Sequence, residues 1–132
     1  MSNILALSEA ATIGIHSMAL IAMTHEKLNV NQIAERIGSS KHHVAKVMQR
    51  LAKENFVSSN RGPTGGFMLK KEPHEISLLN IYEAIEGKVD VLACPGSKET
   101  CPFGNCILGD VTNKITIEFM KFLKVQTLDK YL

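Results

Sequence analysis

The sequence predicts a mainly α-helical fold: a winged helix-turn-helix domain with a two-stranded wing, followed by a long C-terminal helix. Three observations predict it. Two short helical segments meet at a glycine turn near residue 38, a hairpin with a glycine-rich tip follows over residues 56–70, and apolar residues recur at helical spacing towards the C-terminus. The chain has 132 residues, of which 45% are hydrophobic, so it is long and apolar enough to bury one core.

The first helix is expected to run from about Ser8, whose hydroxyl can cap it, to Thr24. Between Ala10 and Met23 it is apolar on nearly all sides apart from His16, so we expect two faces to be covered, one by the core and one by another helix. The apolar run is shorter than the roughly 18 residues of a membrane span. The first residues also lack the basic region of a secretory signal, so we expect no membrane contact and a cytoplasmic location.

The next two helices form the predicted helix-turn-helix. The second covers residues 31–37, and Asn29 with Gln32 has the pattern of a capping box. Gly38 ends this helix because glycine adopts a left-handed backbone readily, and a third helix follows over residues 41–54. The apolar residues of the third helix have the spacing of a buried stripe: Val44, Val47, Met48 and Leu51.

The hairpin consists of predicted strands over residues 56–59 and 67–70. A fourth helix is expected over residues 77–86. A final long helix is expected to begin near Cys106 and to reach about Gln126. Its apolar residues fall on one stripe: Val111, Ile115, Phe119, Phe122 and Val125.

Charge is divided unevenly along the chain. Residues 1–71 carry nine Lys/Arg against four Asp/Glu, a net charge of +5, whereas residues 72–132 carry six against nine, a net charge of −3. We therefore expect only the first part to contact a polyanion such as double-stranded DNA. The alternative is a chance distribution of solvated charges.

In a winged helix-turn-helix the third helix enters the major groove. With the apolar stripe turned inward, the predicted DNA-binding residues are those of the opposite face and of the hairpin tip: Ser40, Lys41, His42, His43, Lys46, Gln49, Arg50, Arg61, Gly62 and Pro63. His42 and Gln49 are assigned to base edges, because they can donate or accept hydrogen bonds there. Lys46, Arg50 and Lys53 are assigned to phosphates. Arg61 is assigned to a minor groove. A solvated helix face on an unrelated bundle is the alternative.

Three cysteines, Cys94, Cys101 and Cys106, lie in a loop rich in Pro and Gly. An odd number of clustered thiols indicates a metal or redox site more than a disulfide framework, and thiolates separated by a few residues can converge on one soft metal. The sequence has neither a C-x-x-C pair beside a strand–helix unit nor a compact nucleophile–base motif. We therefore do not expect an enzyme.

The segment Ile33–Arg36 and the wing sequence RGPTGGFML over residues 61–69 resemble the IscR/NsrR family of winged-helix iron–sulfur transcriptional regulators. The resemblance covers nearly the whole chain and implies a homodimer, held by the C-terminal helix, on a palindromic operator. It divides the chain into a DNA-binding domain over 1–87, a cysteine loop over 88–106, and a dimerisation helix with its tail over 107–132. Position 43 is commonly Tyr in the family and is His here, so no base preference is carried over.

The same resemblance implies an iron–sulfur cluster, 2Fe–2S or 4Fe–4S, held by the three cysteines and modulating DNA affinity with redox state, nitric oxide or iron–sulfur status. The family usually has five residues in each gap, whereas here the gaps are six and four. His16 matches a position from which some members supply a ligand across the dimer, and Glu9 and Asp110 are further candidates. The alternatives are a core histidine at position 16, inert thiols, structural zinc, or a metal-free regulator controlled by a partner protein or by thiol oxidation.

Overall fold

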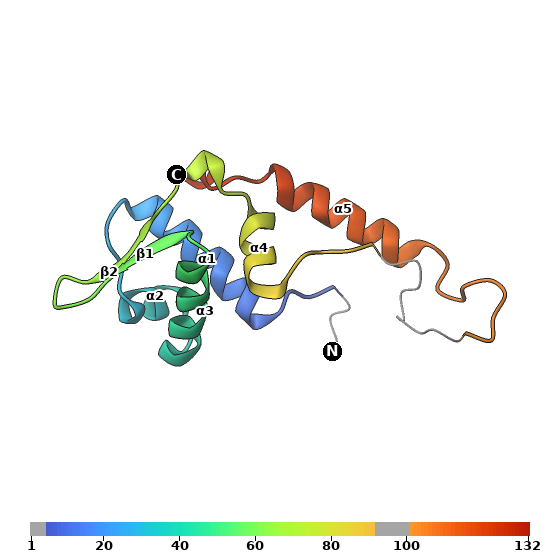
Figure 1. The fold of residues 1–132 in the computed structure, drawn as a ribbon, viewed down its shortest axis with the longest axis horizontal. Helices are drawn as coiled ribbons and strands as arrows, with labels where there is room; N and C mark the ends of the chain where they lie inside the picture. The colour runs from blue at the N-terminus through green and yellow to red at the C-terminus, as the bar shows by residue number, and fades with distance from the viewer. Residues whose placement is uncertain (1–4, 92–100) are drawn as a thin grey trace.

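The computed structural model describes residues 5–91 and 101–132. The elements in chain order are α1 (Glu9–Thr24), α2 (Val30–Ile37), α3 (Lys41–Lys53), β1 (Val57–Asn60), β2 (Gly66–Leu69), the 3-10 helix η1 (Pro73–Glu75), α4 (Leu78–Glu86), α5 (Val111–Val125) and the 3-10 helix η2 (Leu128–Tyr131). The hairpin projects at one end of the molecule and α5 runs towards the other (Figure 1). The predicted winged helix-turn-helix with a C-terminal helix is confirmed. In the described part of the chain, no helix has the length and apolarity needed to cross a membrane.

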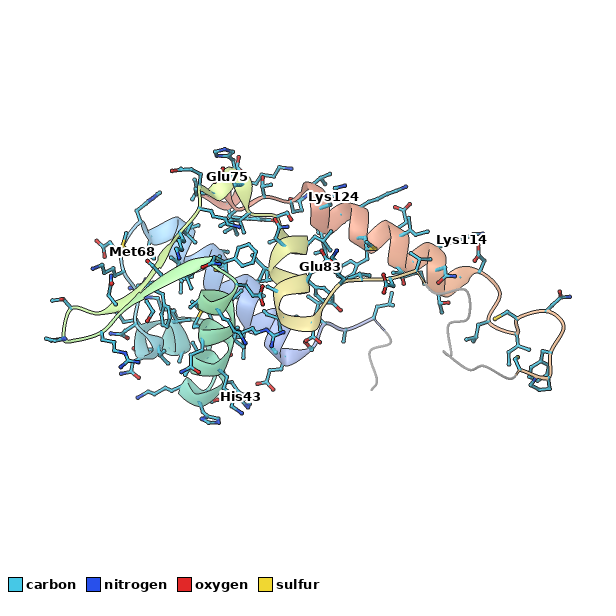
Figure 2. All side chains as sticks on the ribbon, viewed as in Figure 1. His43, Met68, Glu75, Glu83, Lys114 and Lys124 are labelled. Atoms are coloured by element: carbon cyan, nitrogen blue, oxygen red, sulfur yellow. The ribbon has the colours of Figure 1, made fainter. Side chains whose placement is uncertain are left out.

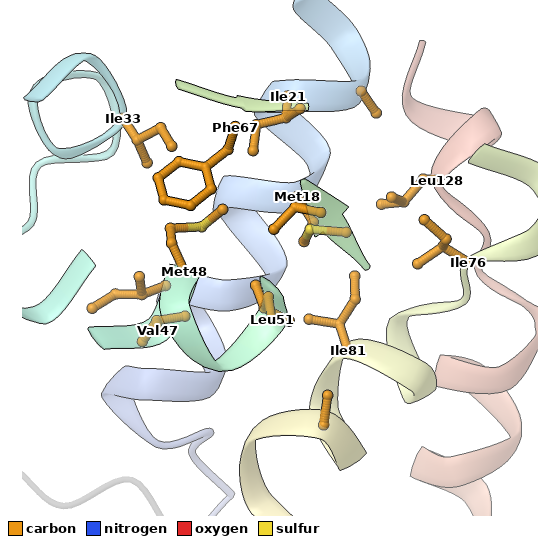
Figure 3. Packing of buried hydrophobic residues seen from close by; sticks show 14 of the residues in the cluster. Met18, Ile21, Ile33, Val47, Met48, Leu51, Phe67, Ile76, Ile81 and Leu128 are labelled. Carbon is orange, nitrogen blue, oxygen red and sulfur yellow. The ribbon is translucent and has the colours of Figure 1, made fainter. Parts of the chain in front are cut away.

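One core joins all the helices of the first ninety residues. Met18 of α1, Leu51 of α3 and Ile81 of α4 are almost fully buried and meet at its centre (Figure 3). The chain end returns to this core. Leu128 is fully buried, and its N–H donates to the carbonyl of Ile76 at 3.0 Å. The tail after α5 is therefore packed against the half of the chain that contains the winged helix-turn-helix.

The helix ends follow the capping residues predicted from the sequence. Asn29 accepts from the backbone N–H of Gln32 at 2.8 Å, and the Gln32 side chain accepts from the Asn29 N–H at 2.9 Å, which completes the capping box. The Ser8 hydroxyl caps α1 as predicted, and the structure shows that the Ser40 hydroxyl caps α3 in the same way. Gly38 has φ +71°, the left-handed conformation that turns the chain sharply between α2 and α3.

Two predicted boundaries differ from the structure. The first strand lies one residue later than predicted, at Val57–Asn60, and the second lies one residue earlier, at Gly66–Leu69. The last helix begins at Val111 and not near Cys106. Gly109 has φ +62° and its N–H donates to the carbonyl of Cys106 at 3.0 Å, so residues 106–109 form a turn that ends before the helix begins.

Candidate nucleic-acid interface

Helix α3 is oriented by its buried stripe. Val44, Met48 and Leu51 have no exposed surface, and Val47 is 6% exposed. The helix packs on α1, α2 and α4 through this stripe. Its other side is left facing solvent, and its N-terminal turn forms a free end of the molecule on which His43 lies (Figure 2). This is the orientation that a recognition helix requires.

All ten residues predicted to bind DNA lie on the surface. The structure brings seven of them together on α3 and its cap: Ser40, Lys41, His42, His43, Lys46, Gln49 and Arg50. The other three, Arg61, Gly62 and Pro63, lie at the tip of the wing. Several of the ten also make contacts within the protein. The Ser40 hydroxyl accepts from the His43 N–H at 3.2 Å, and the Arg50 Nε donates to the Ala84 carbonyl at 3.0 Å.

The wing is anchored to the chain just before α2. Leu28 and Phe67 form an isolated antiparallel bridge, in which the Phe67 N–H donates to the Leu28 carbonyl at 2.8 Å and the Leu28 N–H donates back at 3.3 Å. Gly66 makes this approach possible, because a Cβ there would lie 2.9 Å from the Leu28 carbonyl carbon. The bridge holds the wing beside α2, and a pocket of about 320 Å³ separates the two.

The N-terminal turn of α3 also contacts the beginning of α1. The His43 Nδ1–H donates to the Glu9 Oε1 at 3.1 Å. This contact joins residues 34 positions apart, and so does the Arg50–Ala84 hydrogen bond at the other end of α3. Neither contact was predicted from the sequence, because no local pattern reports a pairing over this distance.

Of the three cysteines, Cys94 lies outside the described residues. Cys101 and Cys106 are exposed and free. Within residues 5–91 and 101–132, no group of three or more His, Cys, Asp or Glu residues comes together as a metal site. Cys101 and Cys106 both lie in the segment over residues 101–110, which precedes α5 and is at the end of the molecule away from the wing (Figure 1).

His16 is exposed on α1, so its interpretation as a core histidine is wrong. Its Nδ1–H donates to the Thr12 carbonyl at 2.7 Å, which leaves Nε2 as the nitrogen able to act as a ligand. Within one chain, α1 and the segment containing Cys101 and Cys106 lie apart (Figure 1). The described part of a single chain therefore does not unite His16 with these two thiols.

Helix α5 presents an apolar face to solvent. Of its fifteen residues, Leu123 is buried, while the predicted stripe is exposed. Exposed fractions along the stripe are 57% for Val111, 38% for Ile115, 43% for Phe119, 53% for Phe122 and 58% for Val125. A groove of about 860 Å³ runs between α5 and the residues preceding α1, Leu5 to Leu7. Exposed apolar surface of this extent is typical of a protein–protein contact.

Comparison with known proteins agrees with this geometry. Residues 7–132 match the Rrf2 family model, described as an iron-dependent transcriptional regulator. The HTH-type transcriptional regulator IscR of Pectobacterium atrosepticum is 33% identical over 99 residues, 74% of this chain and 60% of that protein. The IscR of Yersinia pestis is 34% identical over 97 residues, 73% of this chain and 58% of that protein. The chain thus spans about three fifths of the length of these curated relatives.

Solved structures show the same fold. CymR (YrzC), the global cysteine regulator of B. subtilis, superposes with a TM-score of 0.74 at 24% identity and covers 96% of this chain and 95% of its own. The T. potens IscR gives a TM-score of 0.74 at 25% identity, over 95% of this chain and 84% of that chain. Both comparisons extend through α5 as well as the winged helix-turn-helix.

Proposed function

The chain belongs to the Rrf2 family of transcriptional regulators, and on this premise we propose that it binds double-stranded DNA with α3 in the major groove and the wing in the minor groove. The observation that carries the proposal is the exposed face of α3. There, donors and positive charges are gathered on a helix whose opposite face is fully packed. The family is one of regulators and not of enzymes.

The exposed residues divide into three roles. Lys46 and Lys53 are point charges without base-reading geometry, so we assign them to phosphates. His42 and Gln49 can donate and accept, so we assign them to base edges. Arg61 is presented on a tight turn at the wing tip and suits the enhanced negative potential of a minor groove.

We also propose that the operator-binding form is a homodimer. The apolar stripe of α5 and the groove beside it have no cover within the described part of the chain. A second copy of α5 offers the same stripe, and self-complementary patches generate a two-fold axis. Two recognition helices related by that axis would read two half-sites of a palindrome.

The cysteine segment is proposed to hold an iron–sulfur cluster through Cys94, Cys101 and Cys106, with His16 of the other subunit as a candidate further ligand. The donor chemistry fits, because Cys101 and Cys106 are free thiols and thiolates are the ligands of such clusters. Phe103 and Ile107, which are exposed beside these cysteines, would cover the cluster with apolar side chains once a second copy is present. When bound, the cluster would supply a redox-sensitive constraint on this segment.

Contacts among the described residues connect the cysteine segment to α3, the helix proposed to bind DNA. Helix α4 ends at Glu86, shortly before the cysteine segment, and its Ala84 carbonyl is bonded to Arg50 of α3. The Glu86 carboxylate accepts from the Ser8 hydroxyl at 2.5 Å. A shift in the end of α4 would therefore reach both α3 and α1. We propose that cluster loss alters the spacing of the two recognition helices by population shift.

Two experiments test these proposals separately. Selection from a randomised duplex library tests DNA binding, and enrichment of a palindrome is the expected result. If no sequence is enriched, the DNA-binding proposal fails. An anaerobic absorption spectrum with iron and sulfide quantitation tests the cluster. A colourless protein that contains zinc, or no metal, would instead favour a regulator controlled by a partner protein or thiol oxidation.

A further inference from the structure

The DNA-facing turn of α3 contains an acid–histidine pair whose geometry bears on base selection. The Glu9 Oε1 lies 3.1 Å from the His43 Nδ1, and the side chains are 69% and 52% exposed. A carboxylate oxygen only accepts, so the proton of this hydrogen bond is on Nδ1. Among the described residues no hydrogen bond to Nε2 is present, so this nitrogen remains for a ligand.

His43 is held at both its backbone and its ring. The backbone N–H donates to the Ser40 hydroxyl at 3.2 Å, and the adjoining Val44 has no exposed surface, so the Cα is fixed by the helix cap and by the core. The ring is then fixed by Glu9, which follows the α1 cap Ser8 and is itself held by the helix. The neighbouring His42 ring lies 6.3 Å away, centroid to centroid, and is tilted by 45°.

We propose that Glu9 is a specificity-determining residue of the operator contact, acting through His43. In a neutral imidazole whose proton is held on Nδ1 by the carboxylate, Nε2 is a hydrogen-bond acceptor, here on an exposed ring in the first turn of α3. In the major groove the complementary donors are the exocyclic amino groups of adenine and cytosine. The pair therefore selects adenine or cytosine over guanine or thymine at one position of each half-site. This inference rests on the proposed DNA-binding function.

The charge of Glu9 supports this role. Residues 1–71 contain only four acidic residues, and a carboxylate near DNA repels phosphates. An acid in direct contact with the recognition helix therefore weakens non-specific attraction while orienting one side chain. That combination raises the ratio of specific to non-specific binding.

The test is library selection with the full chain at about pH 8, where histidine side chains are ordinarily neutral. Wild type, Glu9→Ala, Glu9→Gln and His43→Ala are each used to derive a base-preference matrix from randomised duplexes. Glu9→Ala and His43→Ala are expected to lose preference at the same position, by roughly fivefold, the effect of one ordinary hydrogen bond. Glu9→Gln is expected to keep most of this base preference, since the amide oxygen can accept the same hydrogen bond from the His43 Nδ1–H.

Glu35→Ala is the matched control, because Glu35 is an exposed acid on α2 and its removal makes the same change in net charge. It is expected to raise affinity for all duplexes without changing any preference. The inference is overturned if Glu9→Ala leaves the matrix unchanged, if it alters a different position from His43→Ala, or if the selected base is guanine or thymine. A wild-type protein that enriches no sequence would instead reject the proposed function itself.

Discussion

The Arg50 side chain of α3 donates from Nε to the Ala84 carbonyl of α4 at 3.0 Å. The last carbonyls of a helix have no partner within the helix, and Arg50 supplies one. Helix α3 is thereby bonded to the helix that leads into the cysteine segment. Arg50, which was predicted from the sequence to contact phosphate, thus also has a structural role. The two roles are compatible, because the bond to Ala84 uses Nε and the terminal guanidinium nitrogens remain for DNA.

The first prediction concerns the Arg50–Ala84 hydrogen bond. Arg50→Met keeps the aliphatic length and removes the donor, so the free energy of unfolding should fall by about 1 kcal/mol, the net value of a hydrogen bond to a partly exposed charged group. Urea denaturation measures it. Lys53→Met, at an exposed position one turn later on the same helix, is the control and should change the stability by less than about 0.5 kcal/mol. Equal losses in both variants would contradict the role of Arg50.

A second prediction separates phosphate contacts from base contacts. Lys46→Ala should weaken binding to all duplexes about equally and reduce the slope of log K against log salt by about 1, because one fewer counterion is released. Fluorescence anisotropy at several salt concentrations measures the slope. Lys124→Ala, on α5 and away from the interface, should leave it unchanged. A change in base preference without a change in slope would show that Lys46 reads a base.

The apolar face of α5 gives a third prediction. Phe122 is 53% exposed in the single chain, so Phe122→Asp should spare the fold while raising the dimer dissociation constant at least about 30-fold. Sedimentation equilibrium measures this constant. Lys121→Ala, the exposed neighbouring position, is the control and should remain dimeric. A wild-type protein that is monomeric at all concentrations would end the dimer proposal.

The fourth prediction tests the anchoring of the wing. Gly66→Ala places a methyl group 2.9 Å from the Leu28 carbonyl carbon, so the Leu28–Phe67 bridge must open and the unfolding free energy should fall by about 1–3 kcal/mol. Gly104→Ala meets no heavy atom within 4 Å and should be nearly neutral. Thermal unfolding compares the two variants. Equal stabilities would mean that the backbone at Gly66 moves aside without cost.

Local chemistry made much of the fold predictable. The Asn29–Gln32 capping box and the left-handed Gly38 depend on neighbouring residues, and both were predicted from the sequence. The start of α5 was misplaced because apolar spacing does not show where the preceding turn stops, and the left-handed Gly109 ends that turn before the helix begins. His16 could not be assigned to a face because α1 is apolar almost all round, so hydrophobicity does not indicate which side is buried.

The candidate site was predictable in composition but not in its internal contacts. The exposed face of α3 follows directly from the spacing of its buried stripe. The contacts of His43 with Glu9 and of Arg50 with Ala84 arise only when α1, α3 and α4 pack together. Neither the direction of the His43 ring nor the second role of Arg50 is encoded in a local pattern.

DNA binding through α3 and the wing is tested most directly by the affinity of a Lys46→Ala, Gln49→Ala, Arg61→Ala triple variant for the duplex enriched by the wild-type protein. Each side chain is exposed, so the fold should be retained, which thermal unfolding checks. If α3 and the wing bind DNA together, the affinity should fall by at least about 100-fold, from the usual value of such contacts. An unchanged affinity in the folded variant would contradict DNA binding through α3 and the wing.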